Sequence, residues 1–156
     1  MLHSGTHSRE WVNPITSVNM LKLLTKAYRD GGDEAKFLNE ITWHIAIVTN
    51  PDGYVYSHTD DRMWRKTRNP DTPSQCVGVD PNRNWDANWS GPGASNNPCS
   101  QTYYGLSAFS EPCTKLASDY IAKLDPTPQA YIDSHNYSQY WMFPYGYKVK
   151  FKFSVN

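Results

Sequence analysis

Near the start of the chain, a histidine and a carboxylate lie three residues apart with an arginine between them. These residues are His7, Arg9 and Glu10. A catalytic zinc site needs three protein ligands and keeps one position open for water, and a pair with this short spacer can supply two ligands from one turn. Because such pairs also occur by chance among polar surface residues, this one predicts a metal site only if a distant residue completes it.

Four other histidines could supply the third ligand. His135 directly follows a predicted strand over residues 129–134, at the carboxyl end where open α/β sheets bind ligands. His44 alternates within an apolar stretch and is expected to be a packed, hydrogen-bonded core residue. His58 lies in a loop, and His3 is almost terminal. We therefore predict that His135 is the third ligand.

Two arginine-containing clusters could bind an anion. Residues 61–68 hold three arginines and a lysine interleaved with a tryptophan, and residues 80–86 combine an arginine with asparagine and aspartate. Guanidinium forks and an amide suit bidentate binding of a carboxylate. The competing interpretations are a solvated basic loop or a weak nucleic-acid patch for the first cluster, and a turn with capping side chains for the second. The residue types alone leave these alternatives open.

The composition limits the classes of protein that fit. The chain has 156 residues and a net charge of zero, and it has no apolar run of the ~18 residues that a membrane span requires. This length suits one domain with a sizeable core. The charge balance gives no global field that would favour nucleic acid or an anionic membrane, so we expect individual arginines to act locally.

Three cysteines leave two redox states open. Cys76 and Cys99 flank a loop rich in glycine, asparagine, serine and proline, and Cys113 lies in a helical pattern. Either all three are reduced thiols, or one disulfide closes the loop and one thiol is buried, which implies an oxidising compartment. Spacing alone does not separate the two.

Hydrophobic periodicity and turn residues predict helices that alternate with strands. The predicted elements are, in order, a helix from Asn13 to the glycines at 31–32, a strand over 41–48, a turn over 50–54, a helix from Ser110 to Asp125, a strand over 129–134 and an extended segment over 140–145. Such alternation is typical of an α/β sheet. Between residues 54 and 107 there is little periodicity, which is unusual in a compact domain unless the loop is functional or pinned.

Five blocks of the chain, in order, carry a resemblance to a known family. They are Gly5–Trp11, Asn50–Tyr54, Arg62–Arg68, Gly78–Asp86 and Ser134–Gln139. The chain strongly resembles the zinc metallocarboxypeptidases of the pancreatic carboxypeptidase A/B type. The resemblance implies an α/β fold in which part of a mixed β-sheet is flanked by helices, as in zinc-dependent exopeptidases.

The resemblance also implies a zinc site and its chemistry. His7, Glu10 and His135 match the ligands of one zinc ion per chain; two histidines and a glutamate are the known zinc ligands of carboxypeptidase A, so this set comes from the family. Arg65 matches the arginine that polarises the scissile carbonyl and stabilises its developing oxyanion. The implied reaction is hydrolysis of the C-terminal peptide bond by zinc-activated water.

Further residues match positions that bind the peptide substrate. Asn82 and Arg83 match the pair that holds its terminal carboxylate, which restricts attack to the last peptide bond. Arg9, Arg62 and Tyr137 resemble residues that contact the peptide upstream of that bond. The implied partner is a peptide or protein C-terminus, with no nucleic acid or membrane involved and with the protein acting as a monomer.

The match to the family bears on the cysteines as well. Cys76 and Cys99 match the family's loop disulfide, which implies a secreted, oxidised protein, and Cys113 then remains an unpaired thiol packed on its helix.

Some functional residues of the family have no counterpart here. Members extend beyond the equivalents of both chain ends, and no residue matches their general-base glutamate, their mobile tyrosine or the base of their specificity pocket. We therefore expect residues 1–156 to be part of a catalytic domain, and the isolated chain to have little or no activity. The alternative is a non-catalytic module, a pseudoenzyme, that binds zinc and C-terminal carboxylates. Preference for the terminal residue cannot be inferred.

Overall fold

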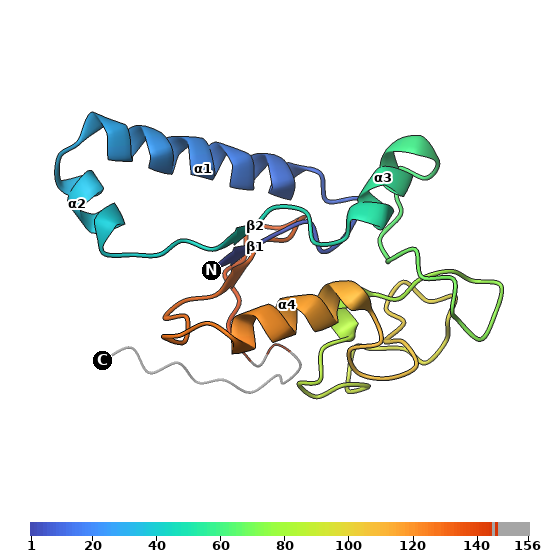
Figure 1. The fold of residues 1–156 in the computed structure, drawn as a ribbon. Coiled ribbons are helices and arrows are strands. Elements are labelled where there is room, and N and C mark those ends of the chain that lie inside the picture. The colour runs from blue at the N-terminus through green and yellow to red at the C-terminus, as the bar shows by residue number, and fades with distance from the viewer. Residues whose placement is uncertain (145, 147–156) are drawn as a thin grey trace.

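The computed structural model describes residues 1–144 and 146 of the chain. Its elements, in order, are β1 (Leu2–His3), α1 (Val12–Asp30), α2 (Asp33–Asn39), β2 (Ile45–Ala46), α3 (Pro51–Thr59), the 3-10 helix η1 (Pro81–Arg83), α4 (Pro112–Ala122) and β3 (Ile132–Asp133). Long irregular loops connect α3, η1 and α4 (Figure 1). No strand forms within residues 140–144, and Tyr145, the end of the predicted extended segment, lies outside the described residues.

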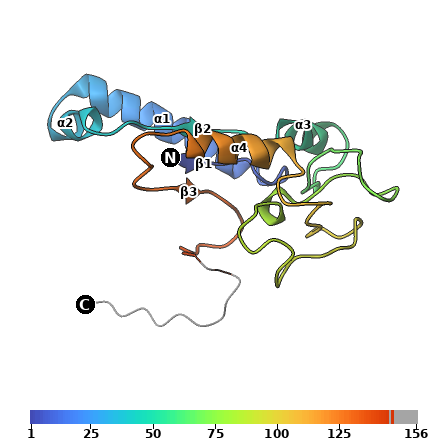
Figure 2. The same cartoon turned by 60° about the horizontal axis from the view of Figure 1, so that its bottom comes forward.

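The described strands form a parallel sheet in the order β2-β1-β3. Leu2 pairs with Ile45 on one side and with Ile132 on the other. In Figure 1 the strands lie between α1 and α4, which confirms the α/β architecture. Because the strands are parallel, their carboxyl ends meet at one edge of the sheet, and the chain segments that follow β1 and β3 leave that edge together. Figure 2 shows the sheet from a second direction.

The two long predicted helices are confirmed. Gly31 ends α1 with a positive φ of 81°, and its N–H donates to the carbonyl of Ala27. Proline at the first position of α4 is preorganised for a helix start. The predicted turn over residues 50–54 is wrong, because this segment begins α3. The Asn50 side chain accepts a hydrogen bond from the Gly53 N–H, so the turn residues act as a helix cap.

The predicted strands are longer than those observed. Only Ile45–Ala46 of residues 41–48 is a strand, and only Ile132–Asp133 of residues 129–134. His44, the predicted core residue, is hydrogen-bonded to the Tyr120 hydroxyl at 2.7 Å but is only half-buried. The apolar residues that predicted these longer strands are partly exposed. Burial of their side chains therefore does not hold the flanking residues in the sheet.

The buried side chains of the described residues are mostly polar. The buried hydrophobic residues are Leu2, Val79 and Tyr103, whereas sixteen polar or charged residues are buried. Apolar side chains instead face a groove of about 600 Å³ between β2 and α4. The interior of this part of the fold therefore depends on satisfied hydrogen bonds more than on an apolar core. Within the described part of the chain, no helix is long and apolar enough to cross a membrane.

Candidate metal centre

The segment that joins β1 to α1 is fixed by close backbone contacts. Gly5 has a φ of 69°, and a Cβ there would lie 2.8 Å from the Val48 Cα. The buried amide of Asn50 donates to the Thr6 carbonyl at 3.2 Å and to the Ser8 hydroxyl at 3.1 Å. This glycine-dependent turn therefore gives the two predicted ligands that it carries a fixed position.

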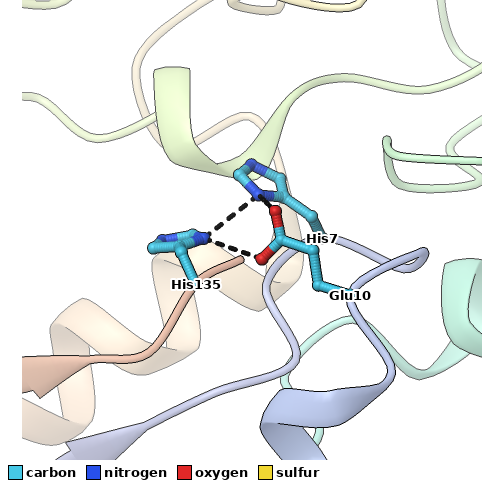
Figure 3. A group of neighbouring side chains, drawn as sticks. All are labelled: His7, Glu10 and His135. Atoms are coloured by element: carbon cyan, nitrogen blue, oxygen red, sulfur yellow. Dashed lines mark hydrogen bonds and ion pairs between the residues drawn. The ribbon is translucent and has the colours of Figure 1, made fainter. Parts of the chain in front are cut away.

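The three predicted ligands converge (Figure 3). His7 Nδ1 lies 2.9 Å from Glu10 Oε1, and His135 Nδ1 lies 3.1 Å both from His7 Nδ1 and from Glu10 Oε2. Zinc–nitrogen and zinc–oxygen bonds of about 2.0–2.1 Å place the ligand atoms of a tetrahedral site roughly 3.4 Å apart. A small outward movement of these three donor atoms would therefore accommodate one zinc ion, so the cluster fits the metal.

Each histidine of the cluster is oriented by a carboxylate on its other ring nitrogen. His7 Nε2 lies 3.0 Å from Asp80 Oδ1, and His135 Nε2 lies 3.0 Å from Asp133 Oδ2. A carboxylate at Nε2 holds a proton on that nitrogen, so Nδ1, which faces the centre, is the nitrogen that can bind a metal. Carboxylate–histidine pairs of this kind orient metal ligands and raise their basicity.

The charges of the centre are tightly balanced. Burial opposes ionisation of Glu10, but hydrogen bonds from His135 and His7 outweigh it and lower the pKa of this carboxyl to about 2. Burial also disfavours the charged form of His135, yet hydrogen bonds to Asp133 and Glu10 raise the pKa of its imidazole to about 9. At neutral pH the metal-free centre therefore holds a proton between two carboxylates, in the place that a metal cation would take.

Arg65 lies directly beside the cluster. Its Nη2 donates to Asp80 Oδ2 at 2.8 Å, its Nε donates to the same oxygen at 3.2 Å, and its Nη1 lies 3.3 Å from His7 Nδ1. Burial disfavours ionisation of Asp80, but its contacts with His7 and Arg65 lower its pKa to about 2. Asp80 therefore fixes the guanidinium so that Nη1 faces the metal centre.

The two residues of the predicted carboxylate clamp flank the same region. Asn82 Nδ2 lies 3.4 Å from His135 Nε2, and the Asn82 N–H donates to Asp80 Oδ1 at 2.9 Å. Arg83 donates from Nε to the Gly93 carbonyl and from Nη1 to the Asn82 carbonyl. Neither contact uses its Nη2, so the fork keeps a donor for a ligand.

The three remaining predicted binding residues make contacts outside the ligand cluster. Arg62 donates to the Arg9 carbonyl at 2.9 Å and stacks over the Trp11 ring at 3.7 Å. Arg9 donates to the Met63 carbonyl, and Tyr137 is 93% exposed. None of these contacts involves a cluster residue, so the structure brings together the ligands, Arg65 and Asn82 more closely than this outer group.

The structure resolves the cysteine alternatives. Cys76 and Cys99 form a disulfide, and Cys113 is a free thiol. Burial, reinforced by the negative charge of Glu111, raises the pKa of the Cys113 thiol to about 12. This thiol is therefore protonated at neutral pH and is a packed side chain, as the helical pattern predicts.

Sequence reasoning missed three residues of the centre. The sequence shows Asp80 only as part of a polar cluster, Asp133 only as part of a strand and His3 only as an almost terminal histidine, yet Asp133 contacts both His3 and His135. Asp80 does cap η1, by accepting from the Asn82 N–H, and it also binds His7. Its position within a motif of the family was the one signal that could have pointed to it.

Fold and cluster together define an α/β protein with a two-histidine, one-glutamate centre of the kind that zinc hydrolases use. Residues 1–154 match the zinc carboxypeptidase family, and the chain belongs to that family. Zinc is the metal of this family, in agreement with the donor set.

Individual relatives support the same assignment. The chain is 50% identical to carboxypeptidase A2 of Mus musculus over 147 residues, which cover 94% of this chain and 35% of the relative. It is 46% identical to a zinc carboxypeptidase of Simulium vittatum, covering 94% of this chain and 48% of the relative. The crystal structure of thrombin-activatable fibrinolysis inhibitor matches with a TM-score of 0.88 and 37% identity, over 95% of this chain and 37% of that chain. The chain thus spans less than half the length of these proteins.

Proposed function

We propose that residues 1–156 form part of the catalytic domain of a zinc-dependent carboxypeptidase, which hydrolyses the C-terminal peptide bond of peptides or proteins. The observation that carries the proposal is the convergence of His7, Glu10 and His135, with a carboxylate behind each imidazole. Membership of the zinc carboxypeptidase family supports the reaction class.

The proposed roles follow from the chemistry of each side chain. His7, Glu10 and His135 would hold one zinc ion, which lowers the pKa of a bound water and polarises a carbonyl oxygen. Arg65 would hold a fixed positive charge where negative charge develops on that oxygen, and its two contacts to Asp80 restrain it there.

Recognition of a free C-terminus is proposed for Asn82 and Arg83. An amide N–H and a guanidinium fork can bind both oxygens of a carboxylate, and an internal peptide bond offers no such group. Fixing the terminus would also orient the adjacent peptide bond for reaction. Arg9, Arg62 and Tyr137 would contact the peptide upstream of that bond.

The proposed setting is extracellular, and the proposed form is a monomer. The disulfide between Cys76 and Cys99 supports the first, because disulfides persist in oxidising compartments.

The carboxylates beside the centre are already engaged. Glu10 is a proposed metal ligand, and Asp80 and Asp133 each accept a hydrogen bond from Nε2 of a cluster histidine. None is free to take a proton from a water molecule, and a missing general base costs about 10²–10⁴-fold in rate. We therefore propose that the isolated 156-residue chain binds zinc but hydrolyses peptides little or not at all.

The lack of a free carboxylate beside the centre, among the described residues, favours a second candidate. This candidate is a non-catalytic module that binds zinc and C-terminal carboxylates. The two are separated by assaying release of the C-terminal residue from a blocked dipeptide, and by measuring binding of a peptide and its C-terminally amidated form. For the 156-residue chain we expect binding of the free acid over the amide and no zinc-dependent hydrolysis. Appreciable hydrolysis would contradict the inactivity. A longer product of the gene that binds but lacks a glutamate base would favour the module.

A further inference from the structure

A cross-strand pair lies directly behind the metal centre. His3 and Asp133 are paired residue to residue in the parallel ladder of β1 and β3. Each strand then leads into a segment that carries a cluster ligand, His7 after β1 and His135 after β3. The pair therefore joins the two strand ends that supply the ligands.

Asp133 uses both of its oxygens on imidazoles. Its Oδ1 lies 3.1 Å from His3 Nδ1, and its Oδ2 lies 3.0 Å from His135 Nε2. The Thr6 hydroxyl donates to Oδ1 as well, at 3.4 Å. An ionised carboxylate is an acceptor only, so both rings must present an N–H to it. With Nε2 held against Asp133, the Nδ1 atom of His135 faces His7 and Glu10 and is the nitrogen that can bind a metal in place of its proton.

The environment of His3 indicates that its ring serves this contact. The ring is buried, and Nε2 has no hydrogen-bond partner among the described residues. An unpaired buried polar atom lowers the stability of the folded protein. An apolar side chain would avoid that cost, so the contact between His3 Nδ1 and Asp133 is the interaction that suits a histidine to this position.

We propose that His3 and Asp133 are a positioning pair that sets the tautomer and the orientation of His135 for metal binding. The inference rests on the proposed metal site. His3 binds one oxygen of Asp133 and thereby directs the other at His135 Nε2. Neither residue of the pair touches the reacting groups; Asp133 acts through His135 as Asp80 acts through His7.

An amide at position 133 should reverse this effect. Asparagine offers one acceptor oxygen and one NH₂ group, so it cannot accept from both rings. If the NH₂ group faces His135, it favours the tautomer with the proton on Nδ1, which is the nitrogen that must bind the metal. If it faces His3 instead, position 133 can no longer accept a hydrogen bond from His3 Nδ1–H.

The test is the zinc dissociation constant of the purified protein, measured by competition with a chromophoric chelator. We expect Asp133→Asn to weaken zinc binding about 10–100-fold, the range for lost outer partners of ligating histidines. His3→Ala should weaken binding by a smaller factor. His3→Asn should restore it, because the asparagine Nδ2 can occupy the place of the imidazole Nδ1–H.

A double-mutant cycle separates positioning from a general structural effect. In a His135→Ala background, Asp133→Asn should cause no further loss of affinity, since it has no ring left to orient. Asp119→Asn, which removes an exposed carboxylate on α4, is the matched control and should bind zinc like the unsubstituted protein.

Two results would overturn the inference, namely unchanged affinity in Asp133→Asn, or a loss that persists in the His135→Ala background. If Asp133→Asn fails to fold, the comparison of His3→Ala with His3→Asn decides, and equal affinities for these two variants count against the pair. Absence of zinc binding by the unsubstituted protein would contradict the metal site itself, and the inference with it.

Discussion

The segment Ser4–Glu10 and the loop Cys76–Cys99 both contribute to the centre, but they are held in different ways. In the first segment, all residues except Arg9 are buried. In the second, residues 86–88 are exposed, and the ends are tied covalently by the disulfide. The first segment is fixed by close packing of its backbone, and the second by a cross-link at its ends together with the buried stretch 78–81.

The difference matches what each segment contributes. His7 and Glu10 are proposed ligands, and a metal centre tolerates only small errors in the positions of its donor atoms. Arg83 comes from the loop and would bind a carboxylate of a mobile peptide, for which a long side chain can adjust. Within the loop, residues 78–81 and Asn84 are buried as well. Asp80 in this buried part binds His7 and Arg65 and so contributes directly to the centre.

The largest expected effect comes from crowding the buried segment. Gly5 and Gly93 both have positive φ values, but a Cβ at Gly5 meets backbone atoms of residues 47–49, whereas nothing lies within 4 Å of one at Gly93. Alanine in a left-handed conformation costs about 1–2 kcal/mol. Overpacking should cost Gly5→Ala about 1–3 kcal/mol more.

The two variants are compared by denaturant unfolding of the metal-free protein, with zinc affinity as a second measurement. Gly5→Ala should lose stability and zinc affinity together, because Gly5 positions the turn that carries His7. Gly93→Ala should lose only the smaller amount of stability. Equal losses in both variants would show that the packing difference between the two segments is unimportant.

A smaller effect is expected from opening the loop. The disulfide closes a separation of 23 residues, so Cys76→Ser combined with Cys99→Ser should lower the free energy of unfolding by roughly 3 kcal/mol. Zinc affinity should fall less than the ~10-fold that loss of an outer partner causes, because Asp80 keeps its contacts to Arg65 and His7. Reduction of the unsubstituted protein should reproduce the change, and reduction of the double variant should add nothing. A larger fall in affinity would mean that the disulfide positions Asp80.

The sequence predicts α1 and α4 well, but it misses α2, predicts a turn where α3 begins, and makes the strands too long. The reason is physical. Helix α1 shows its cap, its periodicity and its terminating glycine locally. Strand length depends on which neighbours pair with it and cover it, which no local pattern states. Residues 50–54 were ambiguous because asparagine and proline both make turns and begin helices.

The residues of the metal centre also differ in whether the local sequence predicts them. His7, Glu10 and His135 could be predicted, the first two from their spacing and the third from its place after a strand. Asp133 and His3 could not be predicted, because their role depends on the register between two strands about 130 residues apart in the sequence. A contact of that kind becomes visible only in the folded chain.

Whether His7, Glu10 and His135 form a metal centre can be measured as the zinc content of the purified protein after equilibrium dialysis against a metal-buffered solution. We expect one zinc ion per chain for the unsubstituted protein and for the Asp119→Asn control. His135→Ala, in which one of the three converging donors is removed, should bind zinc with a lower but measurable affinity and stay largely empty at the free zinc concentration that fills the unsubstituted protein. Zinc bound by His135→Ala as tightly as by the unsubstituted protein would contradict the assignment of the centre.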